Sequence, residues 1–109
     1  MVGIKVTIER FTDEHNPGWV ACSLVDAAGI LHLFEEKVPV VTEEDLDAKN
    51  DYPRPGLVGC EVISSRRGAD GRDLVLVDTE KPWGVESKTG NTRFEVNLDQ
   101  LVEFNNGAG

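Results

Sequence analysis

The first residues of the chain alternate between apolar and polar side chains, which is the pattern of a β-strand with one buried face. The apolar residues of this alternation are Val2, Ile4, Val6 and Ile8. Further runs rich in β-branched and aromatic residues predict strands over 19–25, 30–41, 57–66, 73–79 and 92–98, and a closing strand over 101–104. The chain is therefore predicted to be mainly β.

Short glycine-containing segments separate several of these strands, at 26–29, 68–71 and 87–91. In the first, a two-residue loop would place Ala27 and Ala28 at positive φ, which the Cβ atom makes costly. A type I turn with Gly29 in the left-handed position of a bulge avoids this cost. We therefore expect the bulged turn, which fixes the register of the first hairpin.

The clearest helix start is Thr42, an N-cap residue followed by three acidic residues. Asn50 and Pro53 limit this helix to one or two turns. Several short strands at this spacing, with so little helix, are typical of a small antiparallel β-barrel of the SH3-like, OB-like or translation-factor-barrel kind. We therefore expect a single β-barrel domain over 1–104 with one short helical turn, followed by a flexible C-terminal tail over 105–109.

The 109 residues include 20 acidic and 11 basic side chains, which gives a net charge of −9. The first half is the more acidic one, because residues 1–55 hold 11 acidic and 5 basic side chains. Such a field repels phosphate backbones and attracts basic proteins, so we expect no nucleic-acid partner. No apolar run approaches the length of about 18 residues that a membrane span needs, and the N-terminal residues do not resemble a signal peptide. We therefore expect a cytoplasmic bacterial protein with no membrane partner, in which Cys22 and Cys60 are thiols.

The register of the first hairpin decides whether Ser23 and His32 form a candidate nucleophile and base. The bulged turn places Ser23 opposite Leu33, on the other side of the sheet from His32, which removes this dyad. His32 instead shares an apolar face with Cys22, where one hydrogen bond ordinarily satisfies a histidine. An enzyme that uses Cys22 and His32 stays as an alternative, and it requires a thiol that reacts fast at neutral pH. The favoured expectation is a protein without a catalytic residue.

The acidic segment 45–51 has the carboxylate spacing that begins an EF-hand loop. However, Lys49 occupies a ligand position, Asn50 stands where glycine makes the bend, and Gly56 replaces the bidentate glutamate. A solvated turn is the favoured interpretation. The cysteines and histidines offer no closely spaced ligand pair for zinc, and the chain has no phosphate-binding glycine loop. We therefore expect neither a metal nor a cofactor.

Trp19 and Trp83 both lie beside proline and glycine at the margin of a predicted strand. The favoured role for both is to cap the barrel, because small barrels often close their ends with a large ring. The second role is an anchor for a basic peptide or protein, since binding energy concentrates in rigid aromatic residues. The candidate binding residues are Trp19, Trp83, Phe34, Glu35, Glu36, Glu80 and Glu86. A small-molecule site rimmed by the three aromatic residues is the alternative.

The chain also carries a series of spaced motifs, namely Gly18-Trp19-x-x-Cys22, Asp26-x-x-Gly29, Glu36-Lys37-x-Pro39, Pro82-Trp83-Gly84 and Phe94-x-Val96-x-x-Asp99-Gln100-Leu101. Together they resemble a family of small uncharacterised bacterial β-rich proteins with no assigned function. The resemblance carries over no catalytic or binding residue. The leading expectation therefore rests on the charge and on the tryptophans. We expect an acidic, non-catalytic interaction or accessory module that binds a basic protein surface.

Overall fold

Seven antiparallel strands form one curled sheet within residues 1–104, which are the residues that this computed structural model describes. The elements are β1 (Val2–Asp13), β2 (Trp19–Val25), β3 (Leu31–Lys37), α1 (Val38–Val41), β4 (Arg54–Arg67), β5 (Asp73–Asp78), β6 (Arg93–Asn97), the 3₁₀ turn η1 (Leu98–Gln100) and β7 (Leu101–Glu103). The prediction of a mainly β, antiparallel fold with one short helical turn is confirmed. The expected tail over 105–109 lies outside the described residues.

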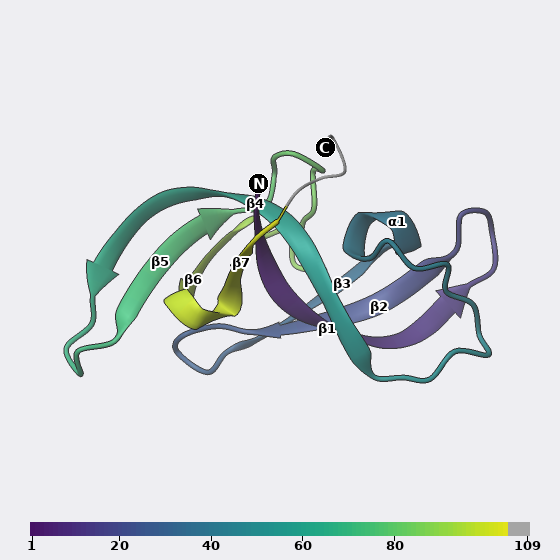
Figure 1. Cartoon of the computed structure of the whole chain (residues 1–109), viewed down its shortest axis with the longest axis horizontal. Coiled ribbons are helices and arrows are strands. Elements are labelled where there is room, and N and C mark those ends of the chain that lie inside the picture. The colour runs from purple at the N-terminus through teal and green to yellow at the C-terminus, as the bar shows by residue number, and fades with distance from the viewer. Residues whose placement is uncertain (105–109) are drawn as a thin grey trace.

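The sheet curls into a half-barrel with the strand order β3-β2-β1-β4-β5-β6, and β7 pairs with the start of β1 (Figure 1). The long strand β4 arches across the molecule because its first half pairs with β1 and its second half with β5. Two backbone hydrogen bonds connect the β2–β3 hairpin with β6 and with the loop that precedes β6. The N–H of Ala27 donates to the carbonyl of Glu95 at 3.0 Å, and the N–H of Lys88 donates to the carbonyl of Leu33 at 2.8 Å.

The hydrophobic core fills the concave side of this sheet. The alternation that predicted β1 places Ile4, Val6 and Ile8 in the core, all nearly inaccessible to solvent. Across the half-barrel, the rings of Phe34 and Phe94 meet edge to face with their centroids 5.6 Å apart. The side chains that fill the interior therefore come from both halves of the sheet.

Gly29 has the predicted turn geometry, with a φ of +82°. Gly71 and Gly90, in the other two glycine-containing segments, adopt φ values of +84° and +86°. The register of the first hairpin is confirmed as well, since Ser23 pairs with Leu33. The Ser23–His32 dyad is therefore absent from the fold, as the turn chemistry predicts.

The position of the helix was predicted wrongly. The strand expected over 30–41 ends at Lys37, and the helical turn is Val38–Val41, so Thr42 ends the helix instead of starting it. Pro39 suits the first turn of a helix, and it cannot donate a hydrogen bond to a sheet. Val38 and Val41 are buried by this turn. The Thr42 hydroxyl accepts a hydrogen bond from the Glu44 N–H at 3.1 Å, so its capping chemistry forms a local turn.

Among residues 1–104, no helix is both long and apolar enough to cross a membrane.

Candidate functional site

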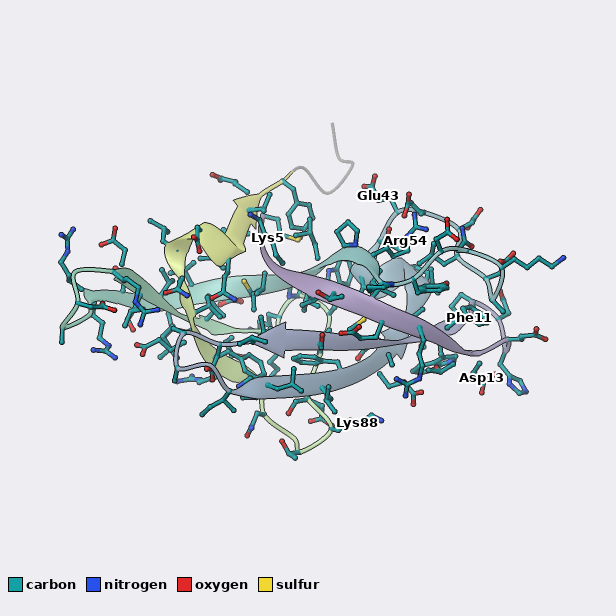
Figure 2. All side chains as sticks on the ribbon, turned by 90° about the horizontal axis from the view of Figure 1, so that it is seen from below. Lys5, Phe11, Asp13, Glu43, Arg54 and Lys88 are labelled. Carbon is teal, nitrogen blue, oxygen red and sulfur yellow. The ribbon has the colours of Figure 1, made fainter. Side chains whose placement is uncertain are left out.

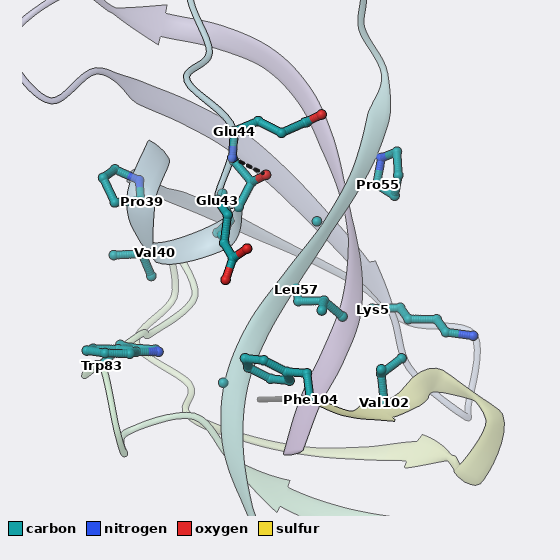
Figure 3. Close-up of a pocket in the computed structure, with 14 residues that line it drawn as sticks. Lys5, Pro39, Val40, Glu43, Glu44, Pro55, Leu57, Trp83, Val102 and Phe104 are labelled. Atoms are coloured by element: carbon teal, nitrogen blue, oxygen red, sulfur yellow. Dashed lines mark hydrogen bonds between the residues drawn. The ribbon is translucent and has the colours of Figure 1, made fainter. Parts of the chain in front are cut away.

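The described part of the chain has an open groove of about 760 Å³ on the outer face of β1 and β4. One wall is formed by α1 and the residues after it, and the other by β4 and by the end of β7 (Figure 3). The apolar lining residues are Pro39, Val40, Leu57, Trp83, Val102 and Phe104. The groove is therefore a largely apolar surface between α1 and the end of β7.

Two glycines that pair across the sheet lie beneath the two aromatic rings of the groove. Gly3 of β1 pairs with Gly59 of β4. A Cβ atom on Gly3 would lie 2.8 Å from the Phe104 ring, and one on Gly59 would lie 3.0 Å from Trp83 Nε1. A side chain at either position would collide with a ring, which shows that both rings lie directly against the sheet backbone.

Trp83 is held in place although 54% of its surface is exposed. It follows Pro82 in a tight turn, in which the N–H of Gly84 donates to the carbonyl of Glu80 at 2.7 Å and Gly84 has a φ of +66°. The ring contacts Gly59 on one side and is open to solvent on the other. A large, immobilised aromatic surface of this kind is typical of a binding site.

Lys5, Glu43 and Glu44 are the charged residues that line the groove. Lys5 and Glu43 project from the same side of the molecule (Figure 2), and the Glu43 carboxylate points into the groove (Figure 3). Glu44 accepts a hydrogen bond from Arg54 at 2.6 Å, which neutralises its charge. Within residues 1–104, neither Lys5 nor Glu43 belongs to an ion pair. Glu43 is thus the acidic group that stays available to a ligand.

The three aromatic residues proposed from the sequence do not come together. Trp83 lines the groove, whereas Trp19 is half-buried at the start of β2, with Lys37 Nζ 5.7 Å from the centre of its ring. Phe34 is only 2% exposed and belongs to the core. Trp83 lies on the outer face of β4, so the favoured role of a barrel cap does not describe its position.

The four acidic residues proposed from the sequence lie outside the lining of the groove. Glu35, Glu80 and Glu86 are exposed, and Glu36 is half-buried. Burial raises the pKa of Glu36, and the nearby charge of Glu86 acts in the same direction. These carboxylates contribute to the negative charge of the protein surface. The acidic residues that line the groove are Glu43 and Glu44.

The groups of the alternative enzyme are placed unfavourably for nucleophilic chemistry. Cys22 is 1% exposed, and this burial, together with the charges of Glu36 and Glu9, raises its pKa to about 12. Burial likewise raises the pKa of Cys60 to about 11. A thiol that stays protonated at neutral pH is a poor nucleophile. His32 is occupied by one hydrogen bond, from Nε2 to Asp26 Oδ2 at 2.8 Å.

The segment that resembles the start of a calcium loop closes on itself. The Asp47 carboxylate accepts the N–H of Lys49 at 2.8 Å, and the side-chain oxygen of Asn50 accepts the N–H of Asp47 at 2.8 Å. These bonds form a local turn of the kind that Asp and Asn favour. Over residues 1–104 no group of three or more His, Cys, Asp and Glu side chains is arranged to hold a metal ion.

Sequence reasoning found Trp83 but missed Val40, Leu57, Val102 and Phe104. Trp83 was found because the flanking proline and glycine mark an exposed turn. The other residues are ordinary apolar positions whose meeting depends on the pairing of β1 with β4 and β7. Comparison with known proteins adds no further guide, because no family model, no curated protein and no solved structure matches the chain.

Proposed function

We propose that this protein is a non-catalytic recognition module that binds a peptide segment of a basic partner protein in the groove beside Trp83. The observation that carries the proposal is the combination of a fixed, half-exposed tryptophan with an unpaired carboxylate in one apolar groove. The bound segment would place an apolar side chain between Trp83 and Leu57, and a Lys or Arg beside Glu43.

The exposed part of Trp83 is large enough to support a specific complex. A tryptophan side chain presents up to about 250 Å², so covering the exposed 54% removes roughly 130 Å² from water. At about 25 cal/mol per Å², this burial contributes about 3 kcal/mol, which corresponds to roughly a hundredfold in affinity. This is the scale of an interface hot spot.

The charge of the chain supports a basic partner. The net charge of −9 attracts a positively charged surface over the distance that salt leaves unscreened. Near the groove, Glu43 supplies the carboxylate for a basic side chain, and the face of Trp83 adds a cation–π contact. An interior site for a small molecule has less support, because the cavity lies outside the barrel and Phe34 is packed in the core.

The experiment is selection of random 12-residue peptides displayed on phage against the purified chain, followed by fluorescence anisotropy with the synthesised winners. We expect these peptides to carry apolar residues with Lys or Arg. Trp83→Ala is expected to weaken binding roughly a hundredfold, and Glu43→Gln to weaken it about tenfold and to reduce its salt dependence.

Two matched variants act as controls. Leu31→Ala removes an exposed apolar side chain of β3, and Glu35→Gln removes an exposed carboxylate of the same strand, and neither residue lines the groove. Both are expected to bind as the wild type does. Failure to select any peptide, or binding that Trp83→Ala leaves unchanged, would contradict the proposal.

A further inference from the structure

One edge of β4 is not covered by another strand. The segment 54–60 of β4 pairs with β1, whereas 61–67 pairs with β5. Since β1 and β5 lie on opposite sides of β4 in the sheet order, the side of 54–60 that faces away from β1 has no neighbouring strand within residues 1–104. This edge borders the groove, because Pro55, Gly56, Leu57 and Gly59 are among its lining residues.

The pairing of β1 shows which backbone groups of β4 point toward this edge. The Met1 amino group donates to the Phe104 carbonyl at 3.2 Å, and the Phe104 N–H donates to the Met1 carbonyl at 2.8 Å. In an antiparallel ladder, successive residues direct their backbone groups to opposite sides. Odd-numbered residues at the start of β1 therefore face β7, and even-numbered residues face β4.

The same alternation continues into β4. Ile4 pairs with Val58, so the backbone groups of Val58 are used in the ladder with β1. Pro55, Leu57 and Gly59 then direct their N–H and C=O groups away from β1. Apart from the sheet ladders, no backbone group of residues 1–104 bonds to Leu57 or Gly59. Pro55 fits this position, since a proline is tolerated in a strand where its missing N–H faces an open edge.

We infer that the partner peptide binds to β4 as an added antiparallel or parallel β-strand, with its backbone bonded to the N–H and C=O of Leu57. This inference rests on the proposed function and names its binding mode. Strand addition supplies affinity through main-chain hydrogen bonds and specificity through alternate side chains. One set of peptide side chains would contact Trp83 and Phe104 on the outer face of the sheet, and the other set would face Val40 of α1.

The charge distribution favours a basic partner segment over a second copy of this chain as the added strand. Two copies would each bring a net charge of −9, and like charges that are brought together oppose association. A basic segment instead gains from the same field and from Glu43, which belongs to no ion pair within residues 1–104. Lys5, the lining residue of opposite charge, extends away from Glu43 (Figure 3). The occupant is therefore an extended segment with apolar residues at alternate positions and with Lys or Arg close to Glu43.

The first test compares Leu57→Pro with Leu57→Ala, with a peptide selected on the wild-type chain as the probe. Both variants lose the leucine side chain, but only Leu57→Pro also loses the N–H that faces the edge. We expect Leu57→Ala to bind weakly and Leu57→Pro to bind about tenfold more weakly still, since one main-chain hydrogen bond is removed. Equal affinity of the two folded variants would overturn strand addition. Circular dichroism and thermal unfolding establish that each variant is folded.

The second test changes the peptide and leaves the protein intact, so it decides the question even where Leu57→Pro does not fold. Each backbone nitrogen of the peptide is methylated in turn, and anisotropy measures the affinity for the wild-type chain. Strand addition predicts a loss of about tenfold at every second position and little loss between them. Equal effects at all positions, or no effect at any, would refute it.

These outcomes separate the binding mode from the function itself. A peptide that loses affinity on Trp83→Ala but ignores N-methylation would support the groove as the site and refute the added strand. The absence of any bound peptide would refute the proposed function. Sedimentation of the chain alone tests whether a second copy occupies the edge of β4. A wild-type dimer that Leu57→Pro converts to a monomer would make a second copy the occupant and overturn the inference.

Discussion

Replacement of Asp26 by alanine is expected to be among the most destabilising changes outside the apolar core. Asp26 lies at the start of the first hairpin turn, and its side chain is 13% exposed. Its Oδ1 accepts the N–H groups of Ala28 and Ile30, both at 2.9 Å, and its Oδ2 bonds to His32 Nε2 at 2.8 Å. One carboxylate therefore fixes both the turn and the histidine that packs against Phe94.

The magnitude follows from these three bonds. Hydrogen bonds to a charged group contribute about 1.5–3 kcal/mol each when buried, and less where water replaces the lost partner. Because Ala28 and Ile30 are exposed, water compensates for much of the loss of their bonds. We expect Asp26→Ala to lower the free energy of unfolding by about 3 kcal/mol. Asp26→Asn keeps an oxygen for the two N–H groups, so about 1 kcal/mol is expected for that change.

The pH dependence has a definite sign. Burial disfavours the charged form of Asp26, but the hydrogen bonds from His32, Ile30 and Ala28 outweigh it and lower the pKa below the ordinary value of 3.8. A carboxylate with a lowered pKa stabilises the fold above its unfolded-state pKa, and this contribution disappears as the pH falls through the folded-state value. The difference between wild type and Asp26→Asn should therefore shrink below about pH 4.

Urea unfolding at pH 7 and at pH 3 measures both effects. With a slope of about 2 kcal/mol per molar urea, a loss of about 3 kcal/mol moves the midpoint by about 1.5 M. Asp70→Ala is the control, because Asp70 also bonds within a hairpin turn, to Arg72, but is exposed. Its loss is expected to cost less than the loss of Asp26, because water replaces the partners of an exposed carboxylate. A cost for Asp26→Ala no larger than that of Asp70→Ala would refute the reasoning.

Two further predictions concern the core thiols and the turns. Because burial raises the pKa of Cys22 to about 12 and of Cys60 to about 11, iodoacetamide at neutral pH should label the folded chain at least about 100-fold more slowly than the urea-unfolded chain. Equal rates would contradict this protection of the thiols, and only labelling faster than in the unfolded chain would favour the enzyme alternative. Gly71→Ala should cost about 1–2 kcal/mol through its positive φ alone, since no atom lies within 4 Å of the added Cβ. Gly71→Asn, which tolerates this conformation better, should cost less in the same urea titration, and the reverse order would contradict the explanation.

The parts of the fold that could be predicted depend on short-range chemistry. Alternation identified β1 because its apolar residues face one side of the sheet, and the preference of Gly29 for positive φ fixed the first hairpin within a few residues. The closing strand expected over 101–104 was found in the same way: β7 spans Leu101–Glu103 and follows η1. In each case the deciding residues are neighbours in the chain.

The helix and the groove depended on longer-range packing. The capping signal at Thr42 is real, but burial of Val38 and Val41 against the core decided where the helical turn lies. The two aromatic rings of the groove lie against the paired glycines Gly3 and Gly59, and neither glycine marks a turn in the sequence. Only the pairing of strands far apart in the chain shows that both glycines make room for aromatic rings.

The strand β4 contributes to both the core and the groove. Its alternation places Val58 and Cys60 in the core, while Leu57 and Gly59 face the groove. The core side thus holds β4 rigidly in place, and the groove side presents a fixed backbone edge and a fixed ring. A ligand that binds there meets a surface that is already ordered, so little of the binding energy is spent on ordering the protein. The proposed binding of a peptide in a groove with few charged groups depends on this preorganisation.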